Sequence, residues 1–414
     1  MAPRKYLYVF FIVFIHWSAF AQTNGAINIG HVDTIYSSIL NESRPIWIHV
    51  PEGSESNIYE PTSYPVIYLL DGDAHFSSVV GMVDQLSSVN GNSICPKMIV
   101  VGIPNTDRTR DLTPTKASSD HPFVDSTMAA HSGGGEAFMD FMEKELIPYI
   151  ESHYSTQPFR MLIGHSFGGL TAINTLFKRP DLFKAYLALD PSMWWDNQRL
   201  LHEIQQAGNK PGYQNRWLYL GIANTMDHEK DTLVGLQDTT VATEHIRNII
   251  YLNRFYDHLQ ISPFKYDSKF YPDDDHGSVP LIATYDALRF FFKSYPVTIS
   301  FEDFMNPDLD LAAKIQKHYE QVSVDFGYEI KPDESLINLI GYQFLGMKQL
   351  EKAEKFFLLN TVNHPKSFNA FDSLGECYQE MGKKEKAIES YQKSIELNPD
   401  SYSKEKLEAL KSNK

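Results

Sequence analysis

The chain has 414 residues, a formal net charge of -15, 43% apolar residues and only two cysteines. This length allows two domains, and the negative charge argues against nucleic acid or an anionic membrane surface as a partner. Cys95 and Cys377 are too few and too far apart for a disulfide framework or a zinc cluster, so we expect no metal and no cofactor.

Residues 1–21 have the pattern of a secretory signal peptide. Arg4 and Lys5 precede an apolar run, and the segment ends in small residues at Ala19 to Ala21. We expect a mature chain that begins near Gln22 and is periplasmic or secreted, with an uncleaved anchor as the alternative. No later run reaches the 18 or so apolar residues that a bilayer requires, so no membrane span is expected in the mature chain.

Short β-rich runs alternate with helix-forming segments between about residues 29 and 292. This alternation predicts an α/β fold with a mostly parallel sheet covered by helices. Reactive side chains in such sheets collect in the loops that follow the strands. The predicted strands are residues 44–50, 65–70, 97–103, 159–163, 185–189, 217–223 and 264–270, and the helix candidates include residues 135–152 and 240–257.

Ser166 stands between Gly164 and Gly168, where an apolar strand gives way to a helical pattern over residues 169–177. A sharp strand-to-helix turn needs glycine on both sides, and it presents the central side chain above the edge of the sheet. The spacing therefore predicts that Ser166 is a nucleophile.

A serine hydroxyl becomes an effective nucleophile only beside a base that a carboxylate orients. In folds of this kind the chain order is serine, acid, histidine. His276 follows the last predicted strand and precedes Gly277 and a final helix over residues 280–292, so it occupies a strand-end loop. We predict that His276 is the base.

The acid is expected after the strand 217–223, in the loop that holds three carboxylates. Asp227 is nearest to the strand end and is our first choice. Asp231 is the alternative, Glu229 comes next, and a Ser-His dyad without a carboxylate also stays open.

The tetrahedral intermediate needs two hydrogen-bond donors for its oxyanion. One is expected to be the backbone N–H of Phe167, and the other the N–H of Asp73 or Gly72 in the loop after the strand 65–70. Trp194 and Trp195 follow the strand 185–189 and are expected to wall a substrate pocket, although only one of the pair can face inward if the segment is extended.

After about residue 294 the sequence becomes charged and helix-forming, with a repeat at a spacing of 34 residues. The matched residues resemble the tetratricopeptide repeat, in which small residues let two helices cross and aromatic residues fill the gap. Two repeats are too few to stand alone, so residues 403–410, residues 308–324, the first domain or a second copy must cover them. The matched pairs are Gly341 and Gly375, Phe344 and Tyr378, Ala353 and Ala387, Phe357 and Tyr391, and Pro365 and Pro399; Lys348 stands where Gly382 turns the second unit.

Five segments together resemble the putative esterase family, which includes enterochelin esterases, feruloyl esterases, S-formylglutathione hydrolases and mycolyltransferases. The resemblance implies an α/β-hydrolase fold, with Ser166 as nucleophile and His276 as base. The sequence departs from the family at the acid, because Asn224 stands where a carboxylate is common. The segments are residues 68–72, 102–111, 145–150, 164–169 and 275–277.

These features predict a signal peptide (1–21), an α/β-hydrolase domain (22–298), a connecting helix (299–331) and a small all-α domain of tetratricopeptide-like repeats (332–414). The expected function is an exported serine hydrolase that cleaves a carboxylic ester of a siderophore, feruloyl or sugar type. The alternatives are an acyltransferase, or an inert hydrolase fold that acts as a scaffold. The expected partners are a small-molecule ester and, through the repeats, another protein or a second copy.

Overall fold

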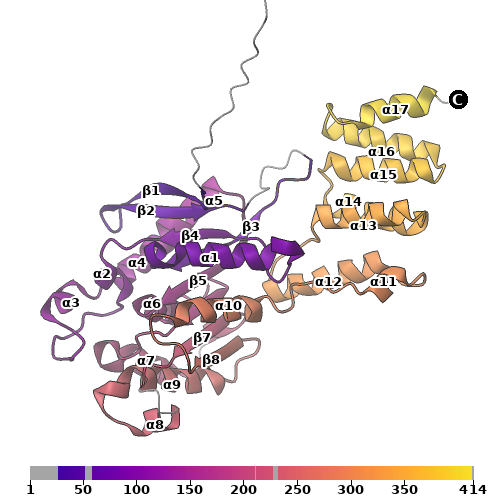
Figure 1. Cartoon of the computed structure of the whole chain (residues 1–414). Helices are drawn as coiled ribbons and strands as arrows, with labels where there is room; N and C mark the ends of the chain where they lie inside the picture. The colour runs from indigo at the N-terminus through magenta and orange to yellow at the C-terminus, as the bar shows by residue number, and fades with distance from the viewer. Residues whose placement is uncertain (1–26, 52–57, 210, 227–231, 413–414) are drawn as a thin grey trace, which may run out of the picture.

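The computed structural model describes residues 27–51, 58–209, 211–226 and 232–412. The predicted signal peptide lies outside these residues. An α/β part carries the central sheet, and a stack of helices continues from one end of it (Figure 1). The fold class predicted from the sequence is confirmed.

Within the described residues the sheet has eight strands, in the order β1-β2-β4-β3-β5-β6-β7-β8. β1 and β2 pair antiparallel, as do β2 and β4, and every later pair is parallel. The carboxyl ends of β3 to β8 therefore lie along one edge of the sheet. The strands are β1 (His31–Ser37), β2 (Glu42–His49), β3 (Tyr64–Leu70), β4 (Ile99–Ile103), β5 (Thr156–His165), β6 (Ala185–Leu189), β7 (Trp217–Ala223) and β8 (Lys265–Tyr271).

Helices cover both faces of the sheet, and each central strand is apolar on both sides. In β5, Leu162 joins the core on one face while Met161 and Ile163 join the core on the other. One face carries α1 (Gly72–Ser87) and α10 (Val279–Phe291). The other carries α4 (Gly135–Phe141), α5 (Ile147–His153), α6 (Phe167–Lys178), α7 (Trp195–Ala207) and α9 (Glu244–Asp257), and the loops hold α2 (Arg108–Leu112), α3 (Ser126–His131) and α8 (Thr232–Gln237).

The C-terminal part is built from two helical pairs followed by a last helix. A Cβ on Gly341 would lie 2.7 Å from the Phe357 ring, and one on Gly375 would lie 2.5 Å from the Tyr391 ring. The two glycines therefore let the helices of each pair cross closely over an aromatic ring. The helices are α13 (Glu334–Gly346), α14 (Leu350–Asn363), α15 (Phe368–Glu380), α16 (Lys384–Leu397) and α17 (Ser403–Ser412).

The turn between the helices of each pair needs a left-handed residue. Gly382 has φ 71° in the second pair, and Lys348 has φ 58° at the matching position of the first pair. A residue with a side chain pays about 1–2 kcal/mol for this conformation. The first unit thus keeps the same turn geometry with a less favourable residue.

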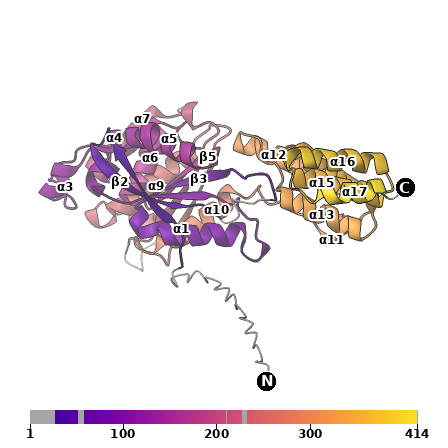
Figure 2. The same ribbon diagram turned by 90° about the horizontal axis from the view of Figure 1, so that it is seen from above.

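α12 (Leu311–Phe326) belongs to both parts of the molecule. Ile315 and Tyr319 lie in the core of the helical part, while Val322 and Phe326 lie in a core of the α/β part. Figure 2 shows the helical stack extending away from the sheet beyond this helix. α11 (Phe301–Met305) contacts α12 through an ion pair of 2.7 Å between Asp303 and Lys314. The segment 299–331, predicted as a connection, is therefore an integral packing element.

Candidate active site

Ser166 lies in a strained turn between the end of β5 and the start of α6. Its backbone has φ 59° and ψ -113°, a conformation that residues with a side chain rarely adopt. A Cβ on Gly164 would overlap the backbone of Gly168, so the turn closes only with glycine there. The hydroxyl Oγ lies 3.2 Å from the Ser192 Oγ and lines a pocket at the edge of the sheet.

His276 and Asp190 form a hydrogen-bonded pair at the same pocket. His276 lies between β8 and α10, and its Nδ1 is 2.6 Å from Oδ2 of Asp190, the residue directly after β6. The Asp190 side chain is fully buried, and its Oδ1 accepts a hydrogen bond of 3.0 Å from the backbone N–H of Ala223. An ionised carboxylate only accepts, so His276 carries a proton on Nδ1 and leaves Nε2 free to accept one.

A second histidine contacts the same carboxylate oxygen. His245, in the first turn of α9, places Nε2 2.8 Å from Asp190 Oδ2. Burial alone would raise the pKa of Asp190, but the hydrogen bonds from His245 and His276 outweigh it and hold that pKa below its usual range. The carboxylate therefore stays ionised. The ligand atoms of these three residues lie within 4.8 Å of one another, a donor set that can hold a metal ion.

His165 directly precedes the nucleophile in the chain. Its ring centroid lies 4.5 Å from that of His276 and 5.7 Å from that of His75. Burial, and then the neighbouring His276 and His75, lower the pKa of His165 to about 4. His165 is therefore neutral at pH 7 and adds no positive charge beside the base.

The first turns of two helices meet at the site. Phe167 begins α6, and Gly72 and Asp73 begin α1, after the neighbouring strands β5 and β3. The N–H groups of a first helical turn have no acceptor within their own helix. A Cβ on Gly72 would lie 2.6 Å from the backbone nitrogen of Ile103, so α1 can start this close to the sheet only with glycine. The predicted oxyanion donors thus all lie at the edge that carries Ser166.

Arg108 completes this corner of the site. Its Nε lies 2.6 Å from Oδ1 of the buried Asp71, and its guanidinium lies 5.4 Å from the centre of the Phe167 ring. Asn105 donates a further hydrogen bond to Asp71. The loop that follows β4 is thereby fixed against the loop that follows β3.

The pocket over Ser166 has a volume of about 320 Å³. Trp194 lines it and stacks on His121 with ring centroids 5.0 Å apart. Trp195 points into the core instead, where its Nε1 donates to the carbonyl of Thr115. One tryptophan of the predicted pair therefore faces the pocket. The other lining residues include His245, His276, Phe123 and Val241.

The predicted acids Asp227, Asp231 and Glu229 lie outside the described residues. The residue that the structure brings to His276 is Asp190, which sequence reasoning missed. Its signal was a carboxylate placed directly after the strand 185–189, one strand earlier along the sheet than the loop that we searched.

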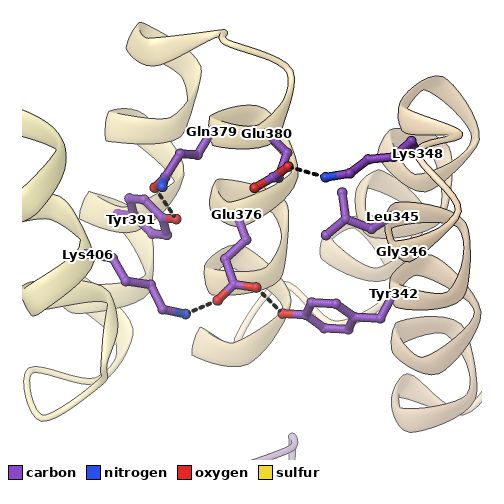
Figure 3. A pocket seen from close by; sticks show the side chains of 9 residues that line it. All are labelled: Tyr342, Leu345, Gly346, Lys348, Glu376, Gln379, Glu380, Tyr391 and Lys406. Atoms are coloured by element: carbon purple, nitrogen blue, oxygen red, sulfur yellow. Dashed lines mark hydrogen bonds and ion pairs between the residues drawn. The ribbon is translucent and has the colours of Figure 1, made fainter.

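A second hollow, of about 450 Å³, lies on the helical repeats (Figure 3). Lys406 pairs with Glu376, and Lys348 lies 2.8 Å from Glu380. The Tyr342 hydroxyl also donates to Glu376, at 2.8 Å. Because these lysines and glutamates pair with one another, the hollow has no excess of either charge to indicate a ligand.

The mostly parallel sheet, the serine elbow and the histidine that follows the last strand define the α/β-hydrolase class. The profile of the family described as Putative esterase matches residues 37–259, and that of the tetratricopeptide repeat matches residues 373–401. The chain belongs to the putative esterase family. No helix in the described part of the chain is both long and apolar enough to cross a bilayer.

Several relatives are named for siderophore esters. Ferri-bacillibactin esterase BesA of Bacillus subtilis is 33% identical over 43% of this chain and 64% of its own length. A siderophore enterobactin esterase of Emericella nidulans is 33% identical over 37% of this chain and 54% of its own. The chain thus spans between half and two thirds of these curated relatives.

A solved structure covers more of the chain. An IroE-like serine hydrolase from Shewanella oneidensis is 30% identical, with a TM-score of 0.66, and the match covers 80% of this chain and 99% of that one. An uncharacterised protein from Capnocytophaga ochracea matches 92% of this chain with a TM-score of 0.55 at 19% identity, which shows the fold alone.

Proposed function

We propose that this chain is an exported serine hydrolase that cleaves a carboxylic ester, with Ser166 as nucleophile, His276 as base and Asp190 as the orienting acid. The observation that carries the proposal is the hydrogen bond of 2.6 Å from His276 to a buried, ionised carboxylate beside the serine elbow. We propose Asp190 in place of the acids predicted from the sequence because, among the described residues, its carboxylate hydrogen-bonds to the base.

The reaction follows from these positions. Ser166 Oγ attacks the ester carbonyl while Nε2 of His276 takes its proton, and Asp190 stabilises the imidazolium that results. The N–H groups of Phe167 and of Asp73 or Gly72 donate to the oxyanion. The intermediate collapses, the alcohol leaves with the proton from His276, and an acyl-enzyme remains. Water then repeats the cycle, releases the acid and restores the free serine.

The substrate that we propose is a siderophore ester. Relatives are named for bacillibactin, enterobactin and triacetylfusarinine C. The pocket fits a ligand with an aromatic or acyl group, because Trp194 and Phe123 form an apolar wall next to Ser166. Export follows from the predicted signal peptide, and the N-terminal sequence of the secreted chain tests it: a start near Gln22 is expected.

A fluorophosphonate probe tests the mechanism, because it reacts with activated serines. We expect one label per chain, at Ser166, and none in Ser166→Ala. Ser152→Ala, which removes an exposed serine hydroxyl on α5, serves as the matched control and should label as the wild type does. If the wild-type protein is not labelled, the hydrolase function is refuted and the inert scaffold is favoured instead.

Hydrolysis of enterobactin and of 4-nitrophenyl butyrate, followed by chromatography, then tests the substrate. Cleavage of the nitrophenyl ester alone would keep the hydrolase and reject the siderophore ester. Adding glycerol to the reaction separates hydrolysis from acyl transfer, because a transferase would form the glyceryl ester.

A further inference from the structure

His245 has no part in the proposed triad, yet it contacts the triad's acid inside the pocket. Its Nε2 lies 2.8 Å from Asp190 Oδ2, the atom that also accepts from His276 Nδ1 at 2.6 Å. The two imidazole rings are nearly perpendicular, with centroids 5.2 Å apart. Two imidazole nitrogens therefore converge on one carboxylate oxygen.

This donor set matches the requirements of a divalent transition-metal ion. Zn²⁺ takes imidazole nitrogens at about 2.0–2.1 Å and a carboxylate oxygen at about 2.0–2.2 Å, often with three protein ligands and one open position. Ligand atoms around such an ion lie roughly 3.3 Å apart. The three ligand atoms already lie within 4.8 Å of one another, so small side-chain movements create the site.

The surroundings favour a cation and give it access. His276 and His245 both line the pocket of about 320 Å³, so an ion can enter from solvent. Asp190 is fully buried, and the backbone N–H of Ala223 holds its Oδ1, the kind of outer-shell contact that orients a ligating carboxylate.

We propose that Asp190, His245 and His276 bind a divalent transition-metal ion such as Zn²⁺, and that the bound ion switches the hydrolase off. The switching part rests on the function proposed above. The binding part depends on the geometry alone.

Inhibition follows from the position of one proton. In the metal-free enzyme Asp190 holds the proton of His276 on Nδ1, so Nε2 can accept the proton of Ser166. A metal on Nδ1 forces the ring proton to Nε2, and the neutral ring then presents a donor to Ser166. His276 stays neutral overall, but its Nε2 no longer has the free lone pair that must accept the proton of Ser166. The ion also occupies Asp190, which can no longer stabilise an imidazolium.

Direct binding is measured first, with protein whose affinity tag has been removed. Titration calorimetry with Zn²⁺ should show one site per wild-type chain, and the same site in Ser166→Ala, which keeps all three ligands. Co²⁺ should give the visible absorption of a tetrahedral site. His245→Gln should weaken Zn²⁺ binding more than about tenfold, because a ligand is lost. His258→Gln, at the other end of α9, is the matched control and should bind as the wild type does.

Inhibition is measured next with 4-nitrophenyl butyrate, each variant relative to its own rate in chelator. Zn²⁺ at a concentration that fills the site should abolish wild-type hydrolysis, EDTA should restore it, and His245→Gln should need more than about tenfold more Zn²⁺. If His245→Gln does not fold, as thermal unfolding would report, His245→Asn replaces it.

Binding that persists unchanged in the His245 variant, or no saturable site in the wild type, overturns the metal site. Binding without inhibition overturns the switch. A wild-type protein that binds Zn²⁺ but has no esterase activity even in EDTA overturns the hydrolase and with it the switch, while the metal site stands.

Discussion

Asp190→Asn is the substitution that examines the proposed triad most directly. The side chain is fully buried and receives three N–H groups, from Ala223, His245 and His276. Asparagine keeps one acceptor oxygen, which can still serve Ala223, but it turns an NH₂ group toward the two histidines. The ring proton of His276 then moves from Nδ1 to Nε2, and Nε2 can no longer accept the proton of Ser166.

The expected loss in kcat is large, because the wrong tautomer removes the base. The corresponding change in a Ser-His-Asp protease lowers kcat about 10⁴-fold, which is about 5.4 kcal/mol at 1.36 kcal/mol per factor of ten. We expect a loss of about 10³- to 10⁴-fold here. The rate of fluorophosphonate labelling should fall in parallel, because both reactions need the same base.

The matched controls are two of the three acids predicted from the sequence. Asp227→Asn and Asp231→Asn should keep kcat/KM for 4-nitrophenyl butyrate within about threefold of the wild type, because the proposed mechanism gives neither carboxylate a role. Thermal unfolding verifies that each variant is folded. If Asp190→Asn retained turnover within about tenfold of wild type while Asp227→Asn lost it, the assignment of the acid would be refuted.

Three further predictions concern the pocket wall, an ion-pair cluster and the elbow. Trp194→Ala should lower kcat/KM for an aryl-acyl ester about three- to tenfold relative to an acetyl ester, because a ring contact is worth about 0.5–1.5 kcal/mol; equal losses for both esters would contradict a substrate contact. Glu42→Gln should cost about 1 kcal/mol of unfolding free energy at pH 7. Its hydrogen bond from Arg110 lowers the pKa of Glu42 from 4.5 to about 2, so this difference should be complete above about pH 4.5 and vanish as the pH falls to about 2 in urea titrations. Gly164→Ala should cost about 3 kcal/mol or more by overlap with the backbone of α6, whereas Gly81→Ala, in open space on α1, should raise the melting temperature slightly.

The sequence predicted seven of the eight strands because each carries a run of apolar or β-branched residues. β1 was missed, and its burial explains why. It is an edge strand in which Val32 and Tyr36 are exposed and Ile35 is buried, so its apolar residues do not line one face. Such a strand is defined by its pairing with β2, which the local sequence does not encode.

The serine and the histidine could be predicted because each depends on local sequence. Ser166 needs glycines beside it, and His276 needs only to follow the last strand. The acid depends on which of two adjacent loops contacts His276. Since β6 and β7 end side by side at the same edge, a carboxylate after either strand can approach the base, and the sequence does not measure that distance. Asp190 also adopts φ 43°, a conformation that its identity alone does not predict.

In the helical part too, the sequence predicts local contacts but not the long-range ones. The glycine and aromatic spacing encodes how the helices cross within each pair, because those contacts are local. What covers the pairs is a long-range question that the sequence left open. Two helices answer it. Leu407 of α17 joins the core of the repeats, as do Ile315 and Tyr319 of α12. Phe326 of α12 packs on Trp217 of the sheet, with ring centroids 5.1 Å apart. A helix shared by two cores ties their stabilities together, so a cut inside residues 299–331 would expose apolar surface on both sides.

The triad and the metal site share the Asp190 Oδ2 atom, so mutation can separate them only at the residues that they do not share. Asp190 Oδ2 fixes the catalytic tautomer of His276 in the free enzyme, and it would be a ligand when an ion is bound. Asp190→Asn therefore removes both properties and cannot distinguish them. His245→Gln removes one metal ligand, and with it one hydrogen bond to Asp190, while Asp190 and His276 keep theirs. The rate of this variant in chelator therefore serves as its own baseline. Ser166→Ala does the reverse, because it removes the nucleophile and leaves every ligand. The two substitutions together decide whether one cluster of side chains serves both catalysis and its control.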